Sequence, residues 1–405
     1  MKILFITTHI TNSAHPAFWR NQTGFGYMVY NIAKYVAKDD DVDMFVANAI
    51  TPPMELDGIK ILGNSWKKFI SCLRISDIVR GIKFAIKYHI SSVKRSLRVI
   101  YMACVLSQIE KKILNYDVVH IHGCSELTEP AIRLCKKHGV KFLVTLHGLN
   151  SFEDSIRIPL GLRQYERDFI KEAAQNHYPV SFISTGNMNT AIDSVGIKVD
   201  SFSVINNGCD IAPQNTFTDI RKIYGIEEND FLFVFVGNIS KNKNQIQVAK
   251  AWNLLPDEEK KYCKVAFVGR FTETDEIVHF IKTNKLEESL ILCGIKPHNQ
   301  VDSFYLAANA TILTSLTEGF GLSIIEGFVY GKPNVTFADL PATLDLYNSE
   351  AMILADDRSD IALSRAMSKA IHLKFDANAI KKYSQKFSLE SMAERYCSKY
   401  KEIQS

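Results

Sequence analysis

The residues best suited to chemistry lie in the segment 314–326, which reads TSLTEGFGLSIIE. An apolar run at 310–313, typical of a buried strand, precedes Gly319 and Gly321, and apolar residues typical of a helix start at Leu322. A helix that begins there presents unpaired backbone N–H groups and the positive end of its dipole. The pattern therefore favours an anion site, such as a site for phosphate.

Two glutamates and three cations accompany this loop. Glu318 is expected beside the anion, and Glu326, about one turn into the helix, is expected to hydrogen-bond hydroxyl groups. Lys241 and Lys243 follow the strand-like run 231–236, and Arg270 follows the run 264–268. Because the carboxyl ends of parallel strands share one sheet edge, these cations and the glycine loop predict a diphosphate clamp. The alternative is that the acids and cations are ordinary surface charges.

The elements that must position these residues are short apolar strands alternating with helical stretches. Continuous Val, Ile and Phe runs are typical of parallel strands covered by helices on both faces. We expect strands at 2–7, 42–46, 117–121, 141–145, 182–183, 202–205, 231–236, 264–268, 290–292, 310–313 and 334–337. The pattern predicts an α/β fold with two Rossmann-like parallel-sheet domains. We place the first at 1–205 and the second at 206–375, and expect helices in 376–405 to pack back toward the first domain.

Composition restricts the function classes. The 405 residues are 46% hydrophobic and 23% charged, which is ordinary for a globular protein. No apolar run reaches the roughly 18 residues of a membrane span, and we find no signal-peptide pattern. The net charge of +4 is too small to suggest nucleic-acid binding, and eight scattered cysteines suit a reduced, cytoplasmic protein.

Positive charge is concentrated in the first half of the chain. Residues 1–205 hold 25 Lys and Arg against 18 Asp and Glu. Segment 66–112 holds eleven basic residues and two acids, and we interpret it as a basic amphipathic helix. Its apolar arc on a helical wheel comprises Ile78, Ile82, Ile86, Ile90, Val93, Leu97, Ile100 and Cys104. Two interpretations stay open: packing against the sheet, and contact with an anionic membrane surface.

The motifs together resemble the retaining glycosyltransferases of family 4, which have the GT-B fold with two domains facing a central cleft. Glu318 and Glu326 stand in an E-x7-E pattern, followed by the Gly-Lys-Pro that begins at Gly331, and Gly237 precedes Lys243 at the family's spacing. Weaker matches lie at 117–122, 144–148 and 204–210. The matches follow the family's order over most of the chain.

The resemblance implies a role for each matching residue. It implies that Glu318, Lys243 and His147 are catalytic: Glu318 contacts the hydroxyls of the donor sugar, Lys243 the diphosphate, and His147 lies near the transferred sugar. Glu326 would bind the ribose, and the nucleobase would lie near Gly294 and Ile295. The remaining donor-binding positions are Gly24 and Gly26 in a loop that closes over the phosphates, Gly237, Asn238, Arg270, Gly319, Phe320, Gly321 and Leu322.

One departure from the family pattern affects the clamp. Asn238 stands where the family usually has Arg, so one cation is missing, and Lys241 or Arg270 would replace it. We expect no metal ligand and no cofactor. The pair His120 and His122 lacks a carboxylate or cysteine at ligand spacing, and the acidic run 39–43 is typical of a solvated turn.

The resemblance implies a retaining, hexosyl-type glycosyltransferase that uses a nucleotide diphosphate donor, with a UDP-sugar favoured. The expected acceptor is a glycan or a lipid-linked glycan in surface polysaccharide or glycolipid synthesis. The expected location is cytoplasmic, peripheral on the inner face of the membrane, with no nucleic acid as partner. Two alternatives remain: a catalytically silent sugar-nucleotide-binding partner of another transferase, and a GT-B-like sugar-nucleotide epimerase. Positional support alone suggests that His9, His15 and Arg20 touch the acceptor.

Overall fold

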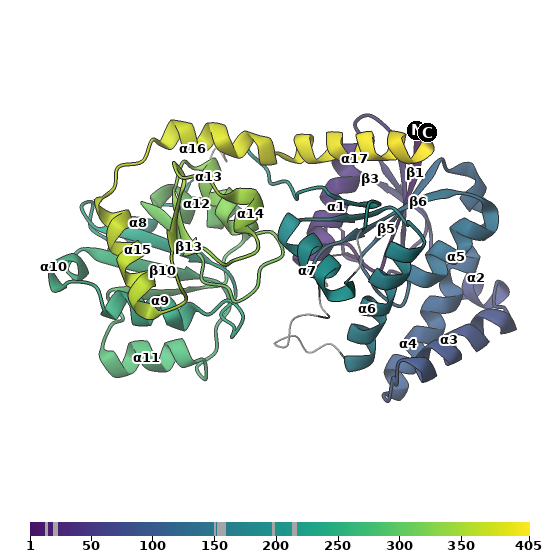
Figure 1. Cartoon of the computed structure of the whole chain (residues 1–405), viewed down its shortest axis with the longest axis horizontal. Coiled ribbons are helices and arrows are strands. Elements are labelled where there is room, and N and C mark those ends of the chain that lie inside the picture. The colour runs from purple at the N-terminus through teal and green to yellow at the C-terminus, as the bar shows by residue number, and fades with distance from the viewer. Residues whose placement is uncertain (13–14, 19–22, 150, 152–158, 197–198, 213–216) are drawn as a thin grey trace. The chain divides into compact units, whose positions relative to one another are not determined.

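The computed structural model describes residues 1–405 except 13–14, 19–22, 150, 152–158, 197–198 and 213–216 (Figure 1). The chain divides into two compact units, one made of residues 1–207 and 389–405, the other of residues 208–388. The expected return of 376–405 to the first domain is therefore wrong for residues 376–388. Helix α16 (Ala377–Ser384) packs against α13 of the second unit, and only the last helix joins the first unit.

Unit 1 is built on a sheet with the strand order β3-β4-β2-β1-β5-β6-β7-β8. All neighbours pair in parallel except β3 and β4, which pair antiparallel. The central strand is apolar along its length, and residues 3–6 are fully buried between helical layers. The strands are β1 (Lys2–Thr7), β2 (Asp41–Val46), β3 (Met54–Leu56), β4 (Ile59–Ile61), β5 (Val118–His122), β6 (Lys141–Leu146), β7 (Val180–Phe182) and β8 (Phe202–Val204).

The last helix of the chain completes unit 1. Helix α17 (Leu389–Gln404) lies beside α1 and contacts β6, so the two chain ends lie close together (Figure 1). Tyr396 and Tyr400 are fully buried, and the Tyr400 hydroxyl lies 2.7 Å from Nδ1 of His120. The other helices are α1 (Gly24–Val36), α2 (Trp66–Ser71), α3 (Ile75–Lys87), α4 (Val93–Val105), α5 (Thr128–His138), α6 (Leu160–Gln175) and α7 (Thr185–Val195), with 3₁₀ turns η1 (Leu106–Gln108) and η2 (Glu110–Asn115).

Segment 66–112 is not one helix, which corrects our expectation. Helices α3 and α4 pack against each other, and the chain between them passes through His89, whose positive φ of 49° ends α3. A Cβ on Gly81 would lie 2.7 Å from the Cα of Ile100, so the absence of a side chain permits this close approach. The expected apolar arc therefore divides. Its members Ile90 and Cys104 are buried, whereas Ile82, Ile86, Val93 and Leu97 are exposed.

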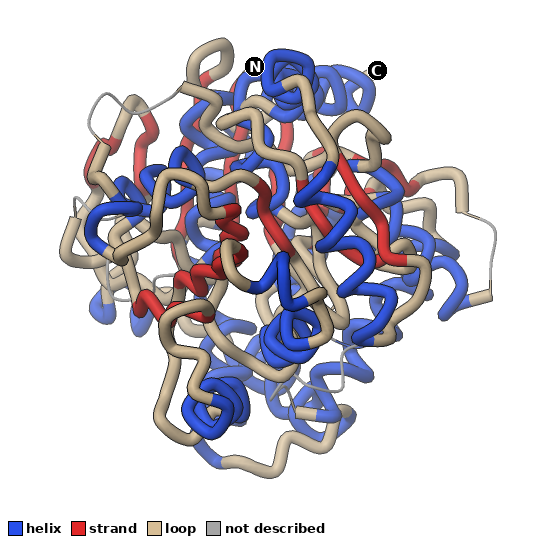
Figure 2. The backbone as a smooth tube through the Cα atoms, turned by 90° about the vertical axis from the view of Figure 1, so that its left-hand side faces the viewer, coloured by secondary structure: helices blue, strands red, loops and turns tan. Residues whose placement is uncertain are grey.

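Unit 2 has a fully parallel sheet with the strand order β11-β10-β9-β12-β13-β14. The strands are β9 (Phe231–Val236), β10 (Cys263–Val268), β11 (Leu290–Gly294), β12 (Ala310–Ile312), β13 (Asn334–Phe337) and β14 (Met352–Ala355). The helices are α8 (Ile220–Ile223), α9 (Gln245–Asn253), α10 (Asp257–Lys260), α11 (Glu276–Asn284), α12 (His298–Ala307), α13 (Leu322–Val329), α14 (Thr343–Leu346), α15 (Asp360–His372) and α16, with the turn η4 (Gln385–Phe387). Figure 2 shows these helices in blue around the red strands.

Both sheets confirm the expected α/β class, and both have a topological switch point. In unit 1 the strand order reverses between β1 and β5, and in unit 2 it reverses between β9 and β12. Loops that leave neighbouring strands in opposite directions open a crevice at the carboxyl ends, where ligands bind in such sheets. The two switch points therefore fix where functional side chains should gather in each unit.

Candidate functional site

The loops after β9 and β12 meet at the switch point of unit 2, and Asn242 joins them. The side chain of Asn242 accepts from the backbone N–H and hydroxyl of Thr317, both at 3.1 Å, and donates to the carbonyl of Thr317. The backbone N–H of Leu316 donates to the carbonyl of Asn242 at 2.7 Å. These hydrogen bonds fix the two loops against each other, so the residues that follow, Lys243 and Glu318, are placed close together.

An ion pair occupies this junction. The Nζ of Lys243 lies 2.6 Å from an Oε of Glu318, and the hydroxyl of Ser315 donates to the same oxygen at 3.0 Å. The Lys243 side chain is 26% exposed and that of Glu318 is 17% exposed, so both remain accessible to a ligand. The expected meeting of strand-end residues is thus observed for Lys243 and Glu318. The pair can supply an ammonium group to a diphosphate and a carboxylate to sugar hydroxyls.

Asn238 links the β9 loop to the β10 loop. Its side-chain oxygen accepts from the backbone N–H of Arg270 at 2.9 Å, and the N–H of Ile239 donates to the Arg270 carbonyl at 2.8 Å. Asn238 and Arg270 are exposed beside Gly237 at this edge. Asn238 therefore holds the loop in place, and Arg270 carries the positive charge.

The turn before α13 follows the expected strand-loop-helix pattern. Gly321 has φ 85° and forms the N-cap of α13, a conformation that glycine adopts without strain, and Leu322 is the first helical residue. Phe320 is 2% exposed and meets Phe387 edge-on at 5.9 Å, so its side chain packs into unit 2. The start of α13 thus offers backbone N–H groups at the sheet edge.

Glu326, one turn into α13, is fixed by a partner that the sequence did not indicate. The hydroxyl of Tyr305 in α12 donates to Glu326 at 2.7 Å. Burial, together with the adjacent carboxylate charge, raises the pKa of Tyr305 far above its usual value. Tyr305 therefore stays a proton donor and orients the carboxylate of Glu326. Ile295, which follows β11, is 63% exposed at the same edge.

Two histidines, His122 and His147, lie together at the carboxyl ends of β5 and β6 in unit 1. His122 Nδ1 lies 3.0 Å from His147 Nε2, and the ring of Phe25 meets His147 edge-on at 5.1 Å. Desolvation lowers the pKa of His147 to about 3, so the ring is neutral near pH 7. Nδ1 of His147 is enclosed and has no hydrogen-bond partner among the described residues. A neutral imidazole donates a hydrogen bond from one ring nitrogen and accepts one at the other.

The expected phosphate loop at Gly24 and Gly26 is the first turn of α1, which corrects our prediction of a loop. Thr23 is the N-cap, and its hydroxyl accepts from the N–H of Gly26 at 3.0 Å. His9 Nε2 lies 2.8 Å from the Thr23 hydroxyl. The stretch 15–18 forms a separate turn, and Arg20 lies outside the described residues.

Three residues that contact or orient the expected site residues were not predicted from the sequence. Phe25 covers His147, Tyr305 orients Glu326, and Arg358 donates to the carbonyl of Ser315 at 2.9 Å. The sequence could have indicated Asn242, because this residue lies in the polar strand-end loop beside Lys243. It could not have indicated Tyr305 or Arg358, since each is far in sequence from the residue it hydrogen-bonds.

Within the described ranges, no group of three His, Cys, Asp or Glu side chains is placed to hold a metal ion. Both ring nitrogens of His120 are engaged, by Tyr400 and by Thr145, each at 2.7 Å. In the acidic run 39–43, Asp40 pairs with the N-terminal amine at 2.6 Å. These contacts give His120 and Asp40 structural roles.

Both parts of the chain match glycosyltransferase family models. Residues 23–212 match the model described as Glycosyltransferase Family 4, and residues 216–387 match Glycosyl transferases group 1. Each of the two segments is thus similar to a glycosyltransferase family, and together they cover most of the chain. The two matches meet close to the boundary between the structural units, and the second contains the Lys243 and Glu318 pair.

Among curated proteins, this chain is 28% identical over 54% of its length to the Escherichia coli UDP-Gal:alpha-D-GlcNAc-diphosphoundecaprenol alpha-1,3-galactosyltransferase. It is 26% identical over 50% of its length to the O-antigen biosynthesis glycosyltransferase WclY of Escherichia coli. The chain spans 57% and 56% of the length of these two relatives.

Solved structures show the same fold. Anabaena Alr3699/HepE in complex with UDP and glucose has a TM-score of 0.69 at 17% identity, covering 99% of this chain and 100% of that one. Sucrose-phosphate synthase from Thermosynechococcus elongatus has a TM-score of 0.72 at 16% identity, covering 99% and 98%. At these identities the similarity shows the GT-B fold.

Proposed function

We propose that this protein transfers a hexose from a nucleotide diphosphate, with a UDP-sugar favoured, to a glycan or lipid-linked acceptor, with retention at the anomeric carbon. The observation that carries the proposal is the pair of Lys243 and Glu318, 2.6 Å apart at the switch point of unit 2. The names of the relatives support UDP donors and polysaccharide synthesis, since one uses UDP-Gal and another acts in O-antigen biosynthesis.

The residues divide the chemistry between them. Lys243 and the backbone N–H groups before α13 stabilise the charge that develops on the β-phosphate as the donor bond breaks. Arg270 adds a second cation at the same edge, and Glu326, oriented by Tyr305, binds the ribose hydroxyls. When the diphosphate engages Lys243, the carboxylate of Glu318 becomes available to sugar hydroxyls. The acceptor hydroxyl then attacks from the face that the phosphate leaves, and the leaving phosphate oxygen takes its proton.

No cofactor or metal ion is part of this proposal, because fixed cations and backbone N–H groups supply the charge at the diphosphate. His147, whose ring is neutral, is the residue of unit 1 that we expect near a hydroxyl of the transferred sugar.

The acceptor side of the proposal rests on unit 1. Helices α3 and α4 expose Ile82, Ile86, Val93 and Leu97 between lysines and arginines, which suits the boundary between anionic headgroups and acyl chains. No helix in the described part of the chain is long and apolar enough to cross a membrane. We therefore propose peripheral binding to the inner face of the membrane, where a lipid-linked acceptor would lie.

Slow hydrolysis of the donor tests the proposal without knowledge of the acceptor, because water can replace the acceptor hydroxyl. The full chain is incubated with α-linked UDP-sugars and the released sugar is followed by proton NMR before it mutarotates. We expect the α anomer from at least one donor, and strongly reduced release by Lys243→Ala. Initial release of the β anomer would contradict retention. Binding of UDP-sugars with no release above that of heat-inactivated protein would instead indicate a catalytically silent binding partner.

A further inference from the structure

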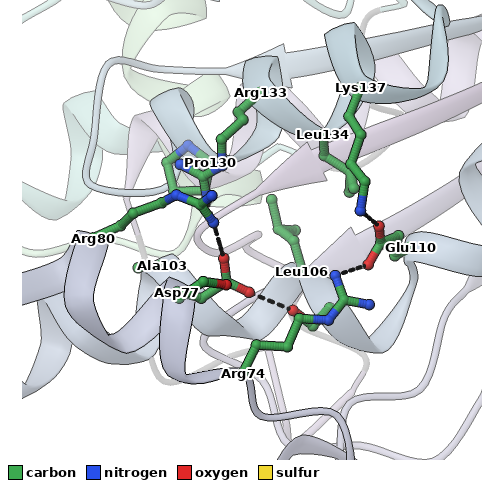
Figure 3. Close-up of a pocket in the computed structure, with 12 residues that line it drawn as sticks. Arg74, Asp77, Arg80, Ala103, Leu106, Glu110, Pro130, Arg133, Leu134 and Lys137 are labelled. Atoms are coloured by element: carbon green, nitrogen blue, oxygen red, sulfur yellow. Dashed lines mark hydrogen bonds and ion pairs between the residues drawn. The ribbon is translucent and has the colours of Figure 1, made fainter.

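A second charged site lies in unit 1, on the outer side of the helical layer. A cavity of about 560 Å³ opens between α3, α5 and the residues that follow α4. One face of α5 lines it with Pro130, Arg133, Leu134 and Lys137. Arg74, the N-cap of α3, and Arg80 within that helix line it from the other side (Figure 3). This volume lies within the range of small-molecule sites, roughly 300 to 1,000 Å³.

Two buried carboxylates form separate ion clusters in the cavity wall. Asp77 accepts from Arg80 at 2.6 Å and from the hydroxyl of Ser107 at 3.1 Å, and Arg133 lies 3.7 Å away. Figure 3 shows this cluster on one side of the cavity and that of Glu110 on the other. The two acids keep the surrounding basic side chains in place.

Glu110 has three basic partners. It pairs with Arg74, accepts from Lys137 at 2.6 Å and lies 3.1 Å from His138. Burial acts to raise the pKa of Glu110, but the bonds from Lys137, His138 and Arg74 hold it down to about 2. The carboxylate is therefore ionised at all pH values near neutrality, and the cluster keeps its charges.

The cations exceed what the two acids need. One cation would neutralise each carboxylate, yet Arg74, Arg80, Arg133 and Lys137 all line the cavity. Glu129, outside the lining, offsets Arg133 at 2.6 Å, so three cations remain against two carboxylates, and the one excess positive charge is shared by Arg74, Arg80 and Lys137. The side chains of Arg74 and Arg80 are 49% and 47% exposed, and each guanidinium has five donors, of which these ion pairs use few.

We propose that this cavity binds a small anion of the phosphate ester or diphosphate class. Guanidinium groups that approach from opposite sides suit a tetrahedral phosphate, which presents several acceptor oxygens in different directions. The floor includes Ala103, Leu106 and Leu134, so the site accepts an apolar substituent on that anion. This proposal does not rest on the proposed transfer reaction, because none of these residues lies in unit 2.

The test is calorimetric titration of the full chain with inorganic pyrophosphate, carried out in a Lys243→Ala background to remove the proposed donor contact. We expect saturable binding that becomes at least ten-fold weaker in Arg74→Gln with Arg80→Gln. Each acid keeps another cation in this variant, so the fold should survive. Lys137→Gln, a single change of a 58% exposed side chain, should also weaken binding. Lys171→Gln, an exposed position on α6 outside the cavity, is the matched control and should bind as the background protein does.

Two results would overturn the proposal: no binding at millimolar pyrophosphate in the background protein, or equal binding before and after loss of Arg74 and Arg80. A second pair of probes distinguishes a lipid headgroup from a free phosphate ester as the bound anion. Tighter binding of dihexanoyl phosphatidic acid than of glycerol 3-phosphate assigns the site to a lipid headgroup. Equal binding of the two assigns it to a free phosphate ester.

Discussion

At the scale of single residues, the buried neutral ring of His147 should lower the stability of the protein at acidic pH. Its ring is held between Phe25 and His122, where desolvation keeps it neutral down to a pKa of about 3. An unfolded histidine takes a proton below about pH 6.5. Between these values the unfolded chain binds more protons, so the free energy of unfolding falls as the pH falls below about 6.5.

We therefore predict that acidification from pH 7 to pH 5 destabilises the protein, and that His147→Asn removes part of this loss. The part due to His147 is at most about 2 kcal/mol at pH 5. Urea unfolding of both proteins at both pH values measures it, with His279→Asn, an exposed histidine, as control. A His147→Asn protein that loses as much stability as the parent would show that this imidazole is not held neutral.

The residues of the donor site were predictable in part. Strand-end loops and their glycines placed Lys243, Glu318 and the turn before Leu322 at one edge, because parallel strands share their carboxyl ends. The support from Tyr305 to Glu326 was not predictable, since it depends on how two helices pack. The substitution of Asn238 was visible in the sequence, but its bond to the backbone of Arg270 was not.

At the scale of elements, helix α17 packs on unit 1, and its buried tyrosines are part of the unit 1 core. The Tyr400 hydroxyl satisfies His120 in the interior. Tyr400→Phe should destabilise unit 1 by about 1 to 3 kcal/mol, because it leaves a buried imidazole nitrogen without a partner. Chemical denaturation measures the change, and Tyr347→Phe, which is the same change at a 52% exposed site, controls for it. Equal stability of the two variants would show that the Tyr400 bond contributes nothing.

The α3 and α4 hairpin is the element we expect to bind membranes. Lys87 lies 3.7 Å from Asp168 and Arg98 lies 3.4 Å from Glu126, whereas Lys83 and Lys94 have no ion pair among the described residues. Each basic residue near an anionic surface contributes about 1 kcal/mol, and the attraction decays over about 8 Å at physiological salt.

Reversing Lys83 and Lys94 to Glu should therefore weaken flotation with anionic vesicles at least ten-fold at low salt. Reversing Lys285 and Lys374, two exposed lysines of unit 2, gives the same change in net charge and should have less effect. Equal recovery of the parent protein on neutral and anionic vesicles, or none on either, would leave the hairpin as ordinary domain packing.

Most elements were predictable, because buried parallel strands have continuous apolar runs. Strand β14 was missed although its sequence, MILA, carries that signal, and β3 and β4 were missed because three-residue strands have little pattern. The break at His89 escaped notice because no Gly or Pro marks it, and its positive φ follows from the packing of α3 on α4.

At the scale of the whole molecule, the proposed transferase stabilises the charge of the leaving diphosphate with fixed side chains and backbone N–H groups. We predict that sugar release from the preferred donor persists in excess EDTA, because Lys243, Arg270 and the start of α13 act at the diphosphate. Turnover is compared with and without EDTA and after addition of Mg²⁺ or Mn²⁺. Complete loss in EDTA, restored by either ion, would require a metal site.

The most direct test of the central claim is the affinity of the full chain for UDP, measured by calorimetry for the parent, Lys243→Ala and Lys250→Ala. Lys250 is the matched control, because it also pairs with a glutamate, Glu276 at 3.2 Å, but on the exposed surface of α9. Loss of one charge-assisted contact costs about 1.5 to 3 kcal/mol. We predict that UDP binds the parent and Lys250→Ala equally and binds Lys243→Ala at least ten-fold more weakly. Equal affinity of all three proteins, or no UDP binding by the parent, would contradict a donor site at this switch point.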